Sequence, residues 1–258
     1  MAANAETNMA CPTASACSSG EERSLRIAVI SCWGYRDAWK PFFELLDKFW
    51  PNCPYPVDLL TDRMEVYSDT KQATVSLGKY SGKRDVIVHP GSWCEILADY
   101  AAGLGEEPCM LFQEDFLLTA SVKQELIEDA LDWLNFGMGM VRLYPCPGAN
   151  QDGLDTNYAI IPQGLPYRIS CQVSIWRPQF LYAIASRFNT PSEFEIEGTK
   201  LADELLDAVM AFKRDLQPWP LEYLCSAISR GKWNPDAKKL CEANGIQADW
   251  SMREFASA

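Results

Sequence analysis

The chain has 258 residues, of which 48% are hydrophobic and 22% charged, and its formal net charge is −12. This composition is typical of a globular protein with a substantial core, in one large domain or two small ones. The acidic balance argues against a broad nucleic-acid-binding face, because neutralising phosphates requires clustered Lys and Arg. Ten cysteines are scattered without a CxxC pair, and the one histidine, His89, cannot complete a Cys/His metal site. We therefore expect reduced, mostly buried thiols and no disulfide framework.

The two ends of the chain differ in composition from its middle. The first 24 residues are rich in Ala, Ser, Thr and Asn and lack the apolar stretch of a signal peptide, so we expect a disordered tail. No apolar run is long enough to span a bilayer, and we expect a cytoplasmic protein without a membrane span. We divide the chain into three parts: a tail at 1–24, a main domain at 25–215, and an irregular extension at 216–258. Three tryptophans should pack this extension onto the domain: Trp219, Trp233 and Trp250.

Hydrophobic periodicity predicts strands that alternate with helices. In the first half we expect strands at 25–33, 57–62, 83–90, 109–115 and 138–144, and helices at 37–50, 92–103 and 121–136. After a long loop we expect strands and helices in alternation: loop 145–166, strand 167–176, helix 177–188, strand 191–198, helix 201–212. This order predicts an α/β fold with a mixed, mainly parallel central sheet flanked by helices.

Two adjacent carboxylates, Glu114 and Asp115, end the predicted strand at 109–115. In mainly parallel sheets the ligand binds outside the carboxyl ends of the strands, so both acids should lie at the ligand edge. Paired carboxylates attract a hard divalent cation, and such a cation can hold a diphosphate. A solvated strand end, or an acid at a helix N-terminus, would explain the same two residues.

The order and spacing of four segments, 92–119, 140–148, 167–184 and 191–198, resemble those of glycosyltransferase-like proteins of the GT-A type found in bacteria and large viruses. The resemblance extends over residues 25 to 200. It implies a GT-A-like catalytic domain at 25–215 that uses a nucleotide-sugar donor in a bacterial or virus-infected cell. Asp115 matches the acid that binds Mn²⁺ or Mg²⁺, and Glu114 is its neighbour in the donor site. Gln113 replaces the first acid of that motif, which leaves metal-independent transfer, or a non-catalytic nucleotide- or glycan-binding module, as alternatives.

The same resemblance implies a donor site at the end of the first strand. Trp33 or Tyr35 could stack on a base, and Arg36 could face a phosphate. Asp62, at the end of the second strand, could bind ribose or base through hydrogen bonds. An aromatic edge of the core with an exposed Arg is the alternative for the first three residues, and a turn residue is the alternative for Asp62.

Three glutamates of the predicted strand at 191–198, Glu193, Glu195 and Glu197, would share one face. The resemblance places a Glu-Phe-Glu element beside the acceptor pocket, so Glu195 is the expected general base and Glu193 its substitute. A direct displacement with such a base inverts the anomeric carbon. A strand with one solvated face is the alternative.

The remaining expectations concern the acceptor and rival enzymes. Trp176 is expected to line the sugar pocket, with a core position as the alternative. The acidic chain favours a glycan, protein or small-molecule hydroxyl as acceptor, but viral enzymes of this type can modify DNA bases, so a hydroxymethyl-pyrimidine acceptor stays open. No GxGxxG, GxxxxGK[ST] or Gly-rich basic loop follows the first strand, which argues against dehydrogenases, P-loop enzymes and sugar nucleotidyltransferases.

Overall fold

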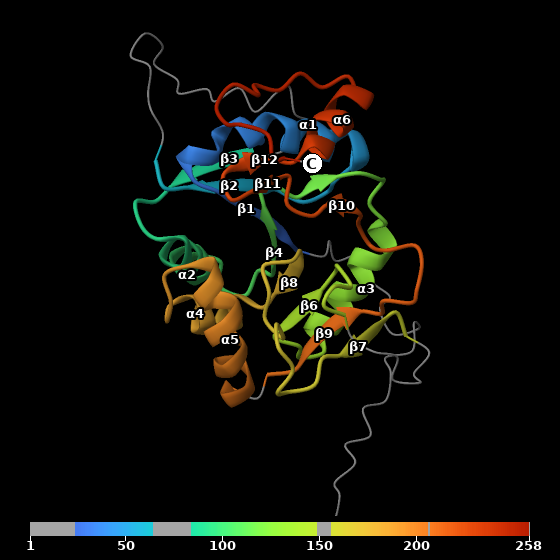
Figure 1. Ribbon diagram of the computed structural model, residues 1–258. Helices are drawn as coiled ribbons and strands as arrows, with labels where there is room; N and C mark the ends of the chain where they lie inside the picture. Colours follow the sequence, from blue (N-terminus) through green and yellow to red (C-terminus); the bar gives the residue numbers. More distant parts are fainter. Residues whose placement is uncertain (1–23, 64–83, 149–155, 206, 258) are drawn as a thin grey trace, which may run out of the picture.

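The computed structural model describes residues 24–63, 84–148, 156–205 and 207–257 (Figure 1). The tail that we predict to be disordered lies outside these residues, except for Ser24. The centre is an eight-stranded sheet in the order β3-β2-β1-β4-β8-β6-β9-β7. Its strands are β1 (Arg26–Ile30), β2 (Val57–Thr61), β3 (Arg84–Val88), β4 (Cys109–Gln113), β6 (Met140–Arg142), β7 (Tyr158–Ile160), β8 (Ser174–Trp176) and β9 (Val209–Phe212).

The sheet is mixed and mainly parallel, as predicted. β3, β2, β1 and β4 are parallel neighbours, and β6 is parallel to β9, whereas β8 and β7 pair antiparallel with their neighbours. In this register Arg26 pairs with Cys109 and Ile30 with Gln113. The carboxyl ends of β1 and β4 therefore lie side by side, and the segments that follow them form one edge of the sheet.

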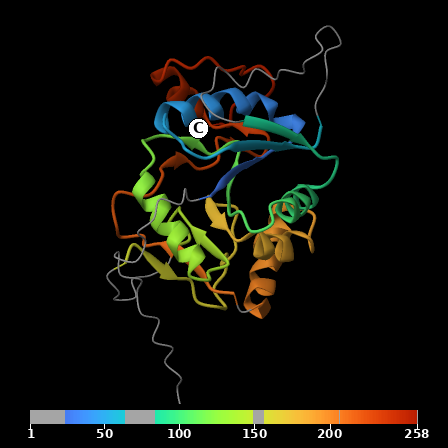
Figure 2. The ribbon, with the colours of Figure 1, turned by 180° about the vertical axis from the view of Figure 1, so that it is seen from behind.

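Helices cover both faces of the sheet (Figures 1 and 2). α1 (Trp39–Phe49), α3 (Gln124–Asn135) and α6 (Pro235–Ala243) pack into one hydrophobic core, and α2 (Trp93–Gly103), α4 (Pro178–Ala185) and α5 (Pro191–Leu205) pack into the other. β1 shows why both cores form: Ile27 and Val29 belong to the first, and Ala28 and Ile30 to the second. An uninterrupted apolar run is what a strand buried on both faces requires.

The prediction of a strand at 191–198 is wrong, because these residues begin helix α5. Thr190 and Glu193 cap this helix: the Glu193 N–H donates to Thr190 Oγ1, and the Glu193 carboxylate accepts from the Asn189 and Thr190 N–H groups. Phe194, Gly198 and Ala202 then recur every four residues and are buried. The three glutamates consequently do not share one face.

Four further expectations need correction. The predicted helix at 201–212 ends at Leu205, and its apolar end forms β9 between β6 and β7. The expected loop at 145–166 contains β7, and only the last three residues of the expected strand at 167–176 form β8. The C-terminal part is not irregular, since it contains α6 and the short strands β10 (Tyr223–Leu224), β11 (Ile228–Ser229) and β12 (Lys232–Trp233).

The packing of the C-terminal part by tryptophans is confirmed. Trp233 is fully buried, and its ring centroid lies 4.9 Å from that of Trp250. Trp219 packs edge-on against Tyr144 at 5.5 Å. β10 also pairs antiparallel with β5 (Leu117–Leu118), which fixes this part of the chain directly after the strand-end acids.

Two further expectations concern the described residues: reduced, mostly buried cysteines, and no helix that spans a membrane. All eight described cysteines are free, and four of them are buried: Cys94, Cys109, Cys171 and Cys241. None of the described helices combines the length and apolar character needed to cross a membrane.

Candidate functional site

The two acids at the end of β4 lie in a tight turn that lines a pocket. The Phe116 N–H donates to the Gln113 carbonyl oxygen at 3.2 Å and closes this turn. The pocket has a volume of about 270 Å³, and we call it the strand-end pocket. Its walls come from the segment after β1, the start of α2, the start of α5 and the loop before β11: Ser31, Cys32, Tyr35, Trp93, Pro191, Ser226 and Ile228.

Glu114 and Asp115 are each only 7% exposed. Burial, and then the charge of Asp115, raise the pKa of the Glu114 carboxyl well above its ordinary value. Burial likewise raises the pKa of Asp115. Two hydrogen bonds to Asp115 Oδ2 oppose this rise, one from Ser226 Oγ at 3.0 Å and one from the Ile228 N–H at 3.3 Å. Two buried like charges are costly, so this pair would gain from a bound cation.

The side-chain oxygen atoms in the strand-end pocket suit a divalent cation that also binds the phosphates of a ligand. Among the described residues, no group of three or more His, Cys, Asp or Glu side chains could enclose a metal ion. Mg²⁺, however, is commonly held by one or two carboxylates together with substrate phosphates. Glu114, Asp115 and the amide of Gln113 line the same pocket and match that incomplete set.

The segment after β1 forms the short 3₁₀ helix η1 (Trp33–Ala38). Asp62 fixes its start, because the Trp33 N–H donates to Asp62 Oδ1 at 2.6 Å. The Trp33 ring is 8% exposed and packs against Trp39, while the Arg36 guanidinium lies 4.7 Å from the Trp33 ring centroid. Of the two aromatic candidates, Tyr35 lines the strand-end pocket and Trp33 belongs to the core beside it.

Arg253, near the C-terminus, supports Tyr35 from outside the pocket. Its Nε and Nη2 donate to the two Asp37 carboxylate oxygens at 2.7 and 2.6 Å, and Nη2 also donates to the Gly34 carbonyl. The guanidinium lies 4.5 Å from the Tyr35 ring centroid, and its charge opposes the rise in the pKa values of Glu114 and Asp115. No local motif marks Arg253, because its partner Asp37 is 216 residues away in the sequence.

We expect Arg253→Lys to destabilise the protein by about 2 kcal/mol, the typical value of one hydrogen bond to a charged group. Lysine keeps the charge, but it cannot form the bidentate hydrogen bonds that Arg253 makes with Asp37, whose side chain is fully buried. Urea denaturation measures the change. Arg187→Lys is the matched control, because Arg187 is exposed, and equal stabilities of the two variants would contradict the prediction.

The two glutamates predicted as general base have different surroundings. Glu195 lies one helical turn after Pro191, so both residues occupy the same face of α5, and Pro191 lines the strand-end pocket. Glu195 Oε1 accepts from the Cys171 N–H at 2.8 Å. Glu193 is exposed and uses its carboxylate to cap α5, whereas Glu195 is half-buried and is bonded to the backbone of Cys171.

Cys225 is a further titratable residue near the strand-end pocket, which its neighbour Ser226 lines. Burial, and also the charges of Asp115 and Glu195, raise the pKa of the Cys225 thiol. Cys225 therefore lies within electrostatic reach of both carboxylates. Cys225 lies on the surface directly before Ser226, the residue that donates to Asp115.

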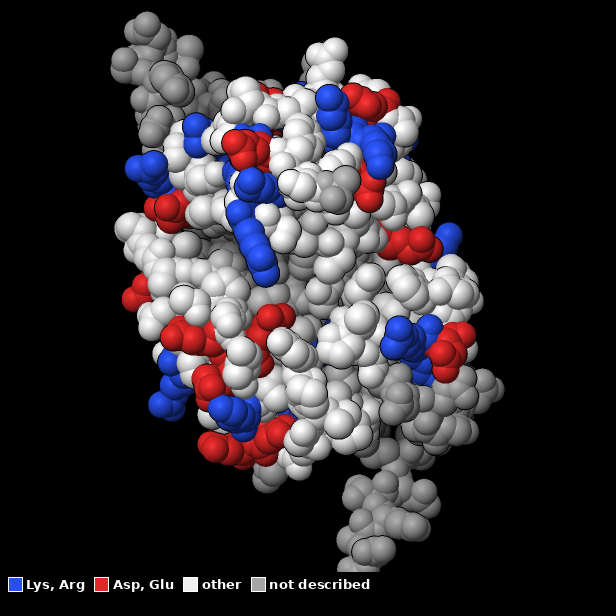
Figure 3. Space-filling model, viewed as in Figure 1, with Lys and Arg blue, Asp and Glu red and all other residues white. Residues whose placement is uncertain are grey.

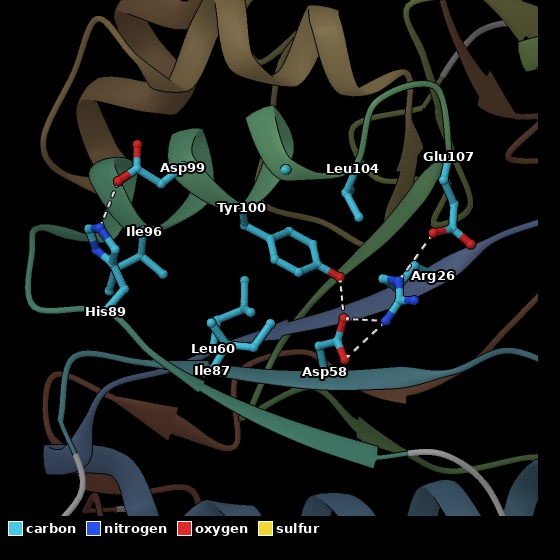
Figure 4. A pocket seen from close by; sticks show the side chains of 11 residues that line it. Arg26, Asp58, Leu60, Ile87, His89, Ile96, Asp99, Tyr100, Leu104 and Glu107 are labelled. Carbon is cyan, nitrogen blue, oxygen red and sulfur yellow. Dashed lines mark hydrogen bonds and ion pairs between the residues drawn. The ribbon is translucent and has the colours of Figure 1, made fainter.

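Trp176, which we expect to line the sugar pocket, lies elsewhere. Trp176 has no exposed surface and packs between Phe180 and Phe194, with ring centroids 5.9 and 5.7 Å away, so the prediction that it lines a sugar pocket is wrong. β8 is a central strand, and its side chains are buried on both faces. His89 lies 2.6 Å from Asp99 Oδ2 and lines a different pocket (Figure 4).

The face of the molecule seen in Figure 3 is hollowed at its centre. The hollow lies between the part with α1 and α6 and the part with α4 and α5. A line of basic side chains reaches it from above, and acidic side chains gather below it.

Comparison with solved structures assigns the fold. The galactosyltransferase LgtC, solved with donor and acceptor sugar analogues, is 12% identical over 85% of this chain and 95% of its own, with a TM-score of 0.51. The chain shares the α/β fold of this galactosyltransferase. A UDP-glucose pyrophosphorylase (10% identity, 86% and 98% coverage, TM-score 0.49) and a cytidylyltransferase from Leptospira borgpetersenii (11%, 92% and 99%, 0.43) are also similar. No family model matches the chain, and no curated protein does.

Proposed function

We propose that the protein is a glycosyltransferase that moves a sugar from a nucleotide-diphosphate donor to an acceptor hydroxyl, with inversion and with help from a divalent cation. One observation carries the proposal: a buried pair of carboxylates lines a pocket at the carboxyl ends of parallel strands in a nucleotide-diphospho-sugar transferase fold. Donor diphosphates bind at this edge in α/β sheets.

Each wall of the pocket then has a role. Glu114 and Asp115 would hold Mn²⁺ or Mg²⁺, which neutralises the charge of the diphosphate leaving group when bound. Tyr35, supported by Arg253, is the aromatic surface for the base, and Asp62 fixes the segment that carries it. The cost of burying two acids would be offset by the cation that they share with the donor.

Glu195 is the proposed general base for the acceptor hydroxyl. Glu195 lies on the same face of α5 as Pro191, which lines the strand-end pocket, and this supports an acceptor that approaches the sugar from that side. The Cys171 N–H donates to its Oε1 and orients the carboxylate that would take the proton from the hydroxyl. A hydroxyl is a poor nucleophile at neutral pH and needs such a carboxylate within hydrogen-bond reach.

Calorimetry with UDP, GDP and dTDP, each with and without Mn²⁺, tests the donor site. We expect one of the three nucleotides to bind and Mn²⁺ to tighten its binding, because the cation bridges the buried acids and the diphosphate. Tight binding that is unchanged by Mn²⁺ would favour metal-independent transfer. Binding of none of the three, in either condition, would contradict the proposal.

A product assay separates glycosyl transfer from the other activities of this fold. Labelled nucleotide sugars are incubated with water alone, with oligosaccharides and with hydroxymethylated DNA. We expect slow donor hydrolysis and transfer to a glycan or small hydroxyl compound, because the charge of −12 disfavours extended polyanions. Transfer to DNA alone would overturn this choice of acceptor, and release of pyrophosphate from a nucleoside triphosphate and a sugar phosphate would indicate a nucleotidyltransferase instead.

A further inference from the structure

A second pocket of about 420 Å³ lies between α2 and the strands at one edge of the sheet (Figure 4). We call it the edge pocket. It shares no lining residue with the strand-end pocket, although both use helix α2. Its volume is within the range of sites for small molecules.

A buried polar cluster closes one end of the edge pocket. Asp58, which is 2% exposed, accepts hydrogen bonds from Tyr100 Oη at 2.6 Å and from Arg26 Nη1 at 3.1 Å. Arg26 also donates through Nε to Glu107 at 3.2 Å. The cluster contains two carboxylates and one guanidinium, so this end of the pocket has an excess of negative charge.

The walls between the two ends are apolar. Leu60 and Ile87 are directly paired on β2 and β3 and lie on the floor, and Ile96 and Leu104 project from α2 and its C-terminus. Ile87 is 37% exposed. The Tyr100 ring lies over this floor and offers an aromatic surface to a ligand.

The opposite end holds His89 and Asp99, whose Nε2 and Oδ2 atoms are 2.6 Å apart. Among the residues that the structure describes, the charged side chains that line the pocket are therefore three carboxylates, one guanidinium and one imidazole. The carboxylates outnumber the cations whether or not the imidazole is protonated. A phosphate or carboxylate ligand is disfavoured here, and a cation is favoured.

We propose that the edge pocket is a binding site for a small organic cation with an apolar, ring-sized body. The body would lie between Leu60 and Ile87 on one side and Ile96 and Tyr100 on the other, and the cationic group would lie beside Glu107 and Asp58. The apolar contact removes Ile87 from water, and the ring of Tyr100 provides a surface that favours cations. This site is separate from the proposed donor site, so its existence does not depend on the proposed function.

Tryptamine, an indole with one ammonium group, is the test probe, and indole-3-propionate, with the same ring and a carboxylate, is its control. Binding is followed by chemical shifts of backbone amides in ¹⁵N-labelled protein. We expect tryptamine at millimolar concentration to shift residues of α2 and β3, and indole-3-propionate to leave them unchanged. Equal binding of the two compounds, or no shift with tryptamine, would overturn the proposal.

Matched variants locate the site. Ile87→Trp should abolish tryptamine binding because the larger ring fills the pocket, whereas Val88→Trp, on the same exposed edge strand but pointing to the other face, should leave it unchanged. Glu107→Gln should weaken binding by up to about fivefold, the effect of a partly exposed ion pair, while Glu106→Gln, which does not line the pocket, should not. Tryptamine binding that survives Ile87→Trp would place the ligand elsewhere and refute the assignment.

Discussion

Glu195→Gln should lower the rate of sugar transfer by about 10² to 10⁴, the usual contribution of a general base. Glutamine is nearly isosteric, and its carbonyl oxygen can still accept from the Cys171 N–H, so folding should stay close to wild type. Nucleotide affinity should also be unchanged, because Glu195 does not line the strand-end pocket. Steady-state kinetics, together with calorimetry on the same preparation, measures both effects.

Glu197→Gln is the matched control on the same helix. Glu197 is exposed and pairs with Lys200 one turn later, so its loss should leave the rate near that of wild type. NMR of the product gives an independent check, because a single displacement inverts the anomeric carbon. Retained configuration, or near-full activity of Glu195→Gln, would remove Glu195 from the role of base.

Asp115→Asn should abolish the effect of Mn²⁺ on nucleotide binding, with at least about a 100-fold loss of metal-dependent affinity, since even changes to outer-sphere partners of a metal cost 10- to 100-fold. The amide removes one of the two carboxylates that line the pocket. Calorimetry with and without Mn²⁺ compares the variant with wild type. Equal nucleotide affinity of the two proteins under both conditions would exclude Asp115 as a metal ligand.

Glu114→Gln should weaken metal binding as well, but it should stabilise the metal-free protein. Burial raises the folded-state pKa of Glu114 above the ordinary value of 4.5, so the folded protein holds this proton more tightly than the unfolded chain does. The contribution of Glu114 to stability is therefore complete below its unfolded pKa and is lost as the pH rises through its folded pKa. Relative to wild type, the variant should gain at least about 1 kcal/mol at pH 7, because one pKa unit corresponds to 1.36 kcal/mol.

Urea denaturation without divalent cations, at a series of pH values between 4.5 and 7, measures this gain. The advantage of Glu114→Gln should grow steadily with pH and should shrink when saturating Mn²⁺ is added to both proteins. Gln113→Glu is the complementary variant, because it restores the acid that the resemblance leads us to expect at this position. A stability difference that is independent of pH would contradict the buried-charge explanation.

The sequence by itself determined the layered part of the fold. Residues 25–33 and 109–115 contain uninterrupted apolar runs, which strands buried on both faces need, and the helices between them have amphipathic spacing and a capping serine at Ser92. The position of Glu114 and Asp115 at the edge of the sheet followed from the same reasoning, since the carboxyl ends of parallel strands meet there. These features depend on neighbours in the chain, and a local pattern can encode them.

Only the tertiary structure decided the rest of the site. The alternating residues 193–197 suit a strand or a helix, and the choice of helix depends on capping by Thr190 and on burial of Phe194 against Trp93 and Trp176. Arg253 reaches Asp37 across 216 residues, and the Ser226 hydroxyl reaches Asp115 across 111. Such contacts leave no periodic trace in a sequence, because each depends on where two distant segments lie once the core has formed. Local sequence patterns therefore predict the strands of the sheet. The long-range contacts around Glu114 and Asp115 form only when the chain folds.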